Sequence, residues 1–136
     1  MGTEMKLNER SIKNLDGVHP DLVRVVYRAA ELCDDLGFIV TEGVRTKERQ
    51  AQLLRKGATK TLNSRHIPDC NSVAMGCAVD IAVTVDGEVR WDWPLYEKMA
   101  LVFKEAAKIE DVKITWGGDW KLRDGPHYEL SRNVYP

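Results

Sequence analysis

The chain has 136 residues, of which 43% are hydrophobic and 30% are charged, and its formal net charge is −1. This length fits one domain with a single core, and the near-neutral charge excludes the basic surface of a typical nucleic-acid-binding protein. No apolar run approaches the roughly 20 residues that span a bilayer, so we expect no membrane insertion. A monomer is the simplest expectation for such a chain.

The N-terminal segment lacks the apolar core of a secretory signal peptide. We therefore expect the protein to be made in the cytoplasm without a signal peptide. Residues 1–4 precede a second methionine, Met5, and we interpret them as a cloning remnant before the natural start.

The three cysteines are an odd number, which argues against the disulfide framework of a small secreted domain. Cys33 lies on the apolar face of a predicted helix, and we expect it to be a small buried apolar side chain. Cys70 and Cys77 flank one loop, and the sequence allows either a disulfide between them or two free thiols. We favour thiols, and we favour metal ligation least, because histidine and aspartate already supply a ligand set.

The first half of the chain predicts two helices around a short strand. Apolar residues recur at helical spacing over 20–36, with Pro20 at the first position and Gly37 as the stop. Residues 38–40 are an apolar run typical of a buried strand. A second helix is expected from Thr46, as N-cap, to Arg55.

Residues 58–77 are a long polar stretch, and a loop of that length in a small domain is usually functional. Residues 79–85 then alternate between apolar and polar, which predicts a strand with two different faces. Asp86-Gly87 is a strong signal for a two-residue hairpin turn, with residues 88–91 as the returning strand.

The last third of the chain predicts a helix from Pro94 to about Lys108, a strand over 112–116 and a short strand over 127–130. No repeat or linker interrupts the chain. We therefore expect a single domain over 1–136 of the α+β class, with a small, mostly antiparallel sheet flanked by helices.

Four polar residues stand out on this framework: His66, Asp80, Asp124 and His127. Two imidazoles and one carboxylate suit a zinc ion with its fourth position open for water, as in catalytic sites. Asp124 lies three residues before His127 and is placed to take a proton from that water. Gly125-Pro126 between them favours a turn over a helix.

Each of these residues also has a simpler interpretation. A lone histidine is more often a surface or hydrogen-bonded residue than a ligand, and His19 is interpreted that way. Spacing alone leaves His66 and His127 undecided between the two. Asp80 is the stronger clue, because a carboxylate on a half-buried strand needs a metal or an arginine as its partner.

Two motifs then carry a family resemblance. Ser64-Arg65-His66 followed by Gly76-Cys77-Ala78-Val79-Asp80 resembles an S-x-H…G-x-A-x-D ligand motif, and Asp124-Gly125-Pro126-His127 resembles a (D/E)-x-x-H motif. Both belong to the zinc peptidases of the VanY/VanX type, which share a hedgehog/D,D-peptidase-like fold. The resemblance is strongest to the L-alanyl-D-glutamate endopeptidases, the phage endolysins of the T5 type and their bacterial relatives. It extends over residues 17–20, 41–46 and 116–120.

The resemblance implies one zinc ion on His66, Asp80 and His127, with Asp124 as general base. It implies that Arg45 stabilises the oxyanion of the tetrahedral intermediate, whereas the simpler interpretation pairs Arg45 with a carboxylate such as that of Glu42.

Further family positions surround these residues. Ser64 and Gln50 match positions expected to orient the ligands by hydrogen bonds. Trp116, Asp119 and Trp120 match a wall of the substrate cleft, although the tryptophans suit a core equally well.

One departure from the family pattern concerns the spacing of the first two ligands. Thirteen residues separate His66 from Asp80, where the compact family motif has six. The extra stretch around 69–75 raises Asp69 as an alternative ligand. We retain Asp80 because of its Ala-x-Asp and strand context, and we expect the loop to line the substrate groove.

The function that the resemblance implies is hydrolysis of the L-Ala–D-Glu bond in peptidoglycan stem peptides, in the cell wall or periplasm after lysis-type release. One alternative is a D,D-carboxypeptidase or dipeptidase of the same fold. The other is a non-catalytic, zinc-stabilised module that binds the wall.

Overall fold

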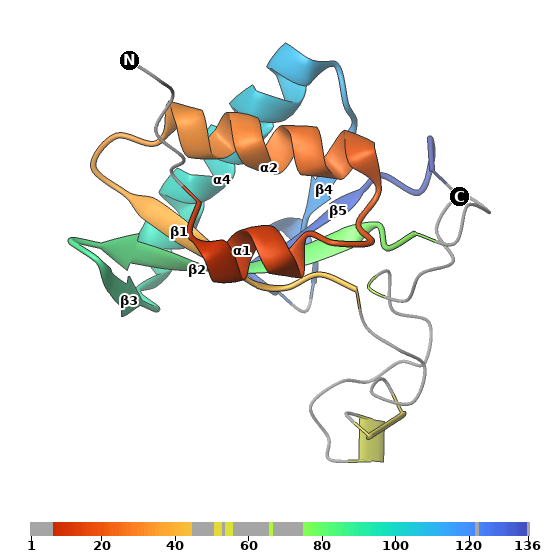
Figure 1. Ribbon diagram of the computed structural model, residues 1–136, viewed down its shortest axis with the longest axis horizontal. Coiled ribbons are helices and arrows are strands. Elements are labelled where there is room, and N and C mark those ends of the chain that lie inside the picture. Colours follow the sequence, from red (N-terminus) through yellow and green to blue (C-terminus); the bar gives the residue numbers. More distant parts are fainter. Residues whose placement is uncertain are drawn as a thin grey trace.

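The computed structural model describes residues 7–44, 51–52, 54–55, 66, 75–121 and 123–135. Figure 1 shows the helices and strands of this part of the chain. In chain order the elements are α1 (Glu9–Asn14), α2 (Pro20–Leu32), β1 (Gly37–Glu42), β2 (Ala78–Val85), β3 (Glu88–Arg90), α4 (Trp93–Glu110), β4 (Ile114–Trp116), the 3-10 helix η1 (Gly117–Asp119) and β5 (His127–Leu130).

All strand pairs of the sheet are antiparallel, and β2 lies at its centre. One edge of β2 pairs with β1. The other edge pairs with β5 at residues 78–80 and with β3 at residues 83–85, and β4 then pairs with β5. The predicted α+β class with a small antiparallel sheet is therefore confirmed.

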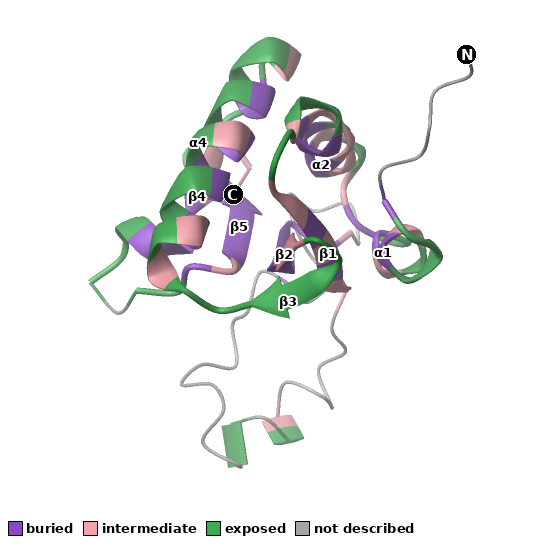
Figure 2. Cartoon of the chain, turned by 90° about the vertical axis from the view of Figure 1, so that its left-hand side faces the viewer, coloured by how far each residue is buried: buried purple, intermediate pink, exposed green. Residues whose placement is uncertain are grey.

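Helices α2 and α4 contact each other and lie on the same side of the sheet (Figure 1). Figure 2 shows that the buried residues gather between these helices and the strands, whereas β3 is exposed. The core there contains Val79 and Ile81 of β2, Tyr128 and Leu130 of β5 and Phe103 of α4. Successive side chains of a strand point to opposite faces. The strand residues that alternate with these core residues therefore lie on the face away from the helices.

Helix α2 ends four residues earlier than the apolar spacing predicts, at Leu32 instead of residue 36. Cys33 is extended, with φ −64° and ψ 138°, and the chain then turns back toward β1. Cys33 and Leu36 still pack against the core from this turn, which explains why the apolar spacing continues past the end of the helix.

The hairpin between β2 and β3 is confirmed. Asp86 and Gly87 both have positive φ, at 53° and 82°, which is the backbone conformation that a type I′ turn requires. The helix expected over 46–55 falls largely outside the described residues, although residues 51, 52, 54 and 55 are helical.

Helix α1 was not predicted from the sequence. It has only six residues, begins after an Asn8 cap whose side chain accepts a hydrogen bond from the Ser11 amide, and buries Ser11. The Ser11 hydroxyl accepts a hydrogen bond from the Val40 amide, and Asn14 donates one to the Val40 carbonyl. Helix α1 therefore holds the end of β1 through polar contacts, which an apolar period does not reveal.

The cysteine predictions need two corrections. Cys77 is completely buried and disulfide-bonded, so the preference for a thiol there was wrong. Cys33 takes part in no disulfide and is only partly buried, because it caps the end of α2 instead of lying inside the helix. Cys70 lies outside the described residues.

Within the part of the chain that the structure describes, no helix is both long and apolar enough to cross a membrane.

Candidate metal centre

Two of the predicted ligands are direct partners across neighbouring strands. Asp80 of β2 lies opposite His127 of β5 in the register of the sheet. Both lie on the face away from the helices, because their neighbours Val79, Ile81 and Tyr128 are in the core. Strand pairing alone therefore places a carboxylate beside an imidazole.

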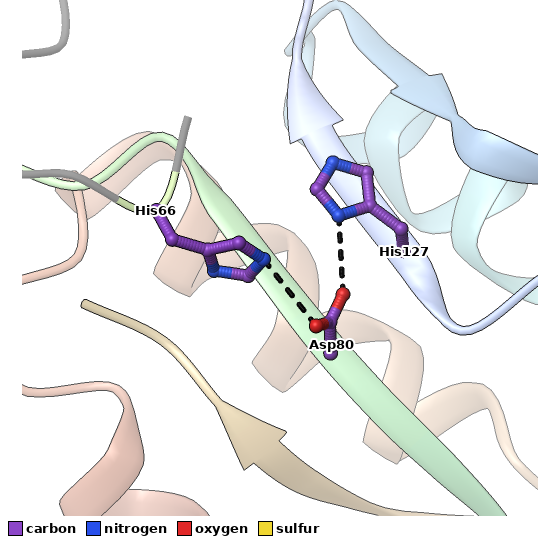
Figure 3. A group of neighbouring side chains, drawn as sticks. All are labelled: His66, Asp80 and His127. Carbon is purple, nitrogen blue, oxygen red and sulfur yellow. Dashed lines mark hydrogen bonds and ion pairs between the residues drawn. The ribbon is translucent and has the colours of Figure 1, made fainter. Parts of the chain in front are cut away.

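His66 completes the group (Figure 3). The Asp80 carboxylate lies between the two imidazoles, with Oδ1 3.1 Å from His127 Nδ1 and Oδ2 3.4 Å from His66 Nε2. The two rings are 5.2 Å apart between centroids. One ligand atom from each residue lies within 4.8 Å of the others, so the three residues can hold a metal ion.

The contact of its Nδ1 sets the tautomer of the neutral His66 ring. His66 Nδ1 lies 2.7 Å from the Gly43 carbonyl, and because a carbonyl only accepts, Nδ1 carries the hydrogen. The lone pair of Nε2 then points toward Asp80. The pairing of β1 with β2 shifts register between Val40 and Glu42, and such a bulge redirects the chain that presents Gly43.

His127 has a carboxylate at each of its two nitrogens. Nδ1 contacts Asp80, and Nε2 lies 2.9 Å from Oε1 of Glu129, a buried residue. Glu129 is not among the candidate residues predicted from the sequence. The available signal was its position two residues after His127 on a predicted strand, which places both on the same face.

These contacts shift two pKa values in opposite directions. Burial alone would lower the pKa of His127, but its hydrogen bonds to Asp80 and Glu129 raise that pKa to about 9. Burial opposes ionisation of Asp80, but its hydrogen bond with His127 and its contact with His66 hold its pKa well below the ordinary range of a carboxyl group. Asp80 is therefore an anion at neutral pH, ready to bind a cation.

The donor set fits a divalent metal ion. It offers one anionic oxygen and two imidazoles, which is a common set for a metal with an open coordination position. The ring nitrogens that face away from Asp80 have acceptors of their own, the Gly43 carbonyl and the Glu129 carboxylate. Such outer contacts are typical of metal-binding histidines.

Asp124 is held in the turn that leads into β5. Its amide donates to the Gly117 carbonyl over 2.9 Å, and the His127 amide donates to the Asp124 carbonyl over 3.2 Å. A Cβ atom on Gly117 would lie 2.4 Å from the Asp124 carbonyl oxygen, so only glycine allows this approach. The predicted turn at Gly125-Pro126 is present, and the exposed Asp124 is close to His127 along the backbone.

The three residues expected in a cleft wall lie in different surroundings. Trp116 is 6% exposed, and its indole nitrogen donates to the Gly125 carbonyl, so it supports the turn from within the core. Asp119 is exposed and pairs with Lys104 at 3.2 Å. Trp120 is 37% exposed and its ring lies 4.9 Å from that of His127, so it borders the metal group.

The remaining candidates, Arg45, Gln50, Ser64 and Asp69, lie outside the described residues. His19 agrees with its simpler interpretation, because its Nδ1 accepts a hydrogen bond from the Asp21 amide at the start of α2.

Comparison with known proteins decides the family. The model of a family described as phage L-alanyl-D-glutamate peptidase matches residues 3–135. The chain belongs to this family. Among its relatives is the L-alanyl-D-glutamate peptidase of Escherichia phage T5, which is 30% identical over 134 residues, covering 96% of this chain and 92% of the phage protein.

Bacterial proteins are similar to this chain as well. The peptidoglycan L-alanyl-D-glutamate endopeptidase CwlK of Bacillus subtilis is 29% identical over 116 residues, covering 78% of this chain and 68% of CwlK. The crystal structure of the L-Ala D-Glu endopeptidase ChiX of Serratia marcescens is similar, with a TM-score of 0.83 and 39% identity, over 96% of this chain and 94% of ChiX. The family resemblance inferred from the two motifs is thus confirmed.

Proposed function

We propose that this protein is a zinc-dependent endopeptidase that cleaves the L-Ala–D-Glu bond of peptidoglycan stem peptides. The observation that carries the proposal is the convergence of His66, Asp80 and His127 in a chain of the L-alanyl-D-glutamate peptidase family. Two nitrogen donors and one oxygen donor suit zinc, and three protein ligands leave one coordination position for chemistry.

Bound at this group, zinc would act as a Lewis acid that polarises the scissile carbonyl and makes water more acidic. His66, Asp80 and His127 would hold the ion. Asp124 would accept the proton of the attacking water and return it to the amine of the departing D-Glu. The motif and its position in the turn before His127 support this role for Asp124.

Other side chains would bind and orient the substrate. Arg45, by its match to the family position, would stabilise the negative charge that develops on the carbonyl oxygen. Ser64 and Gln50 would orient ligands by hydrogen bonds. Trp120, which borders His127, is the described aromatic residue best placed to contact a stem peptide. We also propose a substrate contact for Asp119, one residue before Trp120 in the chain.

The test is mass spectrometry of purified peptidoglycan after incubation with the protein and zinc, in parallel with Asp124→Ala. Fragments that begin with D-Glu, absent with the variant, would support both the bond and the base. Release of a single terminal alanine would instead identify a D,D-carboxypeptidase. If the protein binds zinc but the peptidoglycan stays intact, the protein is instead a zinc-stabilised module that binds the wall.

The site of action follows from the substrate. We propose that the protein acts as a monomer on the cell wall, or in the periplasm, after release of the lysis type. The test is to add the protein to cells with an intact or a permeabilised outer membrane. We expect lysis only of the permeabilised cells, because the protein must reach the wall to cut it.

A further inference from the structure

We propose that Glu129 is a positioning residue for the metal centre: it accepts the Nε2 hydrogen of His127 and thereby directs Nδ1 toward the metal. The inference rests on the metal site proposed above and concerns a residue outside the two motifs described in the sequence analysis. It adds a third carboxylate to the site, one that acts through His127 and not on the substrate.

The first step concerns which nitrogen of His127 would bind the ion. Nδ1 is the nitrogen that lies 3.1 Å from Asp80, on the side where the three ligand side chains converge (Figure 3). A metal held by His66, Asp80 and His127 would therefore meet Nδ1. Nε2 must then carry the ring hydrogen, because a neutral imidazole has one donor and one acceptor nitrogen.

The second step concerns what receives that hydrogen. Glu129 Oε1 lies 2.9 Å from His127 Nε2, within hydrogen-bonding distance. The Glu129 side chain is only 5% exposed, so water does not readily replace this acceptor. His66 has the same arrangement in another form, with Nδ1 donating to the Gly43 carbonyl and Nε2 directed at Asp80.

The third step concerns how Glu129 is itself held. Its other oxygen lies 3.4 Å from Nε of Arg132, three residues further along the chain. The sheet fixes its backbone on both sides, because Glu129 pairs with Ala78 of β2 and Thr115 of β4. A buried carboxylate is costly unless it is partnered, and here the imidazole and the guanidinium are its partners.

The fourth step concerns the position of Glu129 in the sheet. Its neighbours Tyr128 and Leu130 are completely buried in the core, so Glu129 lies on the opposite face, the one that carries Asp80 and His127. An apolar side chain could be buried at this position without the desolvation cost of a carboxylate. The carboxylate is explained by the hydrogen that His127 must place there when Nδ1 binds a metal.

Carboxylates behind a metal-binding histidine fix the orientation of the ring and make the ligating nitrogen more basic. Removal of such a partner typically weakens metal affinity by about 10- to 100-fold. We expect that loss for Glu129→Met, which keeps the approximate volume and removes the acceptor. Glu129→Gln keeps an amide oxygen that accepts the same hydrogen, and we expect it to stay within a few-fold of the parent.

The experiment measures zinc dissociation constants by competition with a chromophoric chelator, without substrate. The protein, Glu129→Met and Glu129→Gln are compared with Glu88→Met, which removes an exposed glutamate from β3 of the same sheet. Circular dichroism of the metal-free forms checks folding. Proton NMR then follows the Nε2 hydrogen of zinc-bound His127, which should be protected from exchange in the parent and Glu129→Gln and lost in Glu129→Met.

Weaker zinc binding in Glu129→Met, restored in Glu129→Gln, would support the proposal. Equal affinities in all four proteins would overturn it, and so would an equal loss in Glu129→Met and Glu129→Gln, because the amide retains the acceptor. Failure of the parent to bind zinc would overturn the metal site as well. The proposed function and this inference therefore fail separately: a parent that binds zinc but cuts no peptidoglycan leaves the role of Glu129 intact.

Discussion

Asp80 and His127 face each other across two paired strands, and Oδ1 of Asp80 lies 3.1 Å from Nδ1 of His127. Their separation is therefore set by the register between β2 and β5. His66 reaches the same point from a separate segment and is held there through its bond to the Gly43 carbonyl. Strand pairing alone thus positions two of the three ligand residues.

Asp80→Asn should remove the metal with little change in the shape of the site. The amide lacks the negative charge that a cation requires between the two imidazoles. We expect zinc affinity to fall by more than the roughly 100-fold typical of an outer contact. Zinc content after dialysis, measured by mass spectrometry of the element, checks this, and full occupancy of the variant would show that Asp80 is not a ligand.

Asp124→Ala should lower turnover by about 10²- to 10⁴-fold, as for loss of a positioned general base. Zinc affinity should remain close to that of the parent, because Asp124 is not among the three ligand residues. Asp35→Ala, which removes an exposed carboxylate from the turn before β1, is the matched control and should keep full activity. A reduced zinc content in Asp124→Ala would instead assign Asp124 to the ligand set.

The metal-free protein should lose stability as the pH rises from about 6.5 to about 9. The folded-state pKa of His127, about 9, lies above the ordinary value of 6.5, so the protonated ring stabilises the folded state fully below pH 6.5. That contribution disappears as the pH passes through the folded-state value. Urea unfolding at pH 6, 7.5 and 9 in a chelator tests this, with His127→Gln as the control that should remove this part of the pH dependence.

The same pKa predicts proton release on metal binding. At pH 7.5 the ring of His127 is mostly protonated in the metal-free form, and a nitrogen that binds a metal must be deprotonated. Titration calorimetry in buffers of different ionisation enthalpy should therefore detect about one released proton per metal ion from this residue. Heats that do not vary with the buffer would contradict the prediction.

Gly117→Ala should disturb the turn that carries Asp124. The added methyl group would lie 2.4 Å from the Asp124 carbonyl oxygen and 3.0 Å from His127 Cβ, so the backbone must shift. Overpacking of this kind typically costs about 1–3 kcal/mol, and we expect a loss of turnover with it. An unchanged melting temperature together with unchanged turnover would show that the turn relaxes freely.

Tyr128→Phe should leave the free energy of unfolding unchanged or raise it by about 1 kcal/mol. The Tyr128 hydroxyl is buried and has no hydrogen-bond partner among the described residues, so its removal ends a desolvation cost. Tyr128→Ala should instead cost about 3–5 kcal/mol, because the ring stacks on Phe103 in the core. Urea denaturation measures both, and a clear loss in Tyr128→Phe would reveal a partner for the hydroxyl.

The local patterns of the chain predicted much of the framework. The alternation over 79–85 specified a strand with a core face and a polar face, and Asp86-Gly87 specified the turn after it. The same patterns and the two motifs identified His66, Asp80 and His127 as one group. These features depend on residues close together in the sequence, or on motifs whose order is visible there.

Residue order and spacing along the chain thus specified the class of the fold, the family and the three candidate ligands. The end of α2 and the short helix α1 came only from the folded structure, because each depends on contacts with distant segments. The structure also shows the disulfide of Cys77, which the residue pattern alone left open. It also decided the place of Glu129, whose side chain on its own looks like an ordinary surface acid. Pairing of β5 between β2 and β4 buries that carboxylate and leaves His127 Nε2 within 2.9 Å of it.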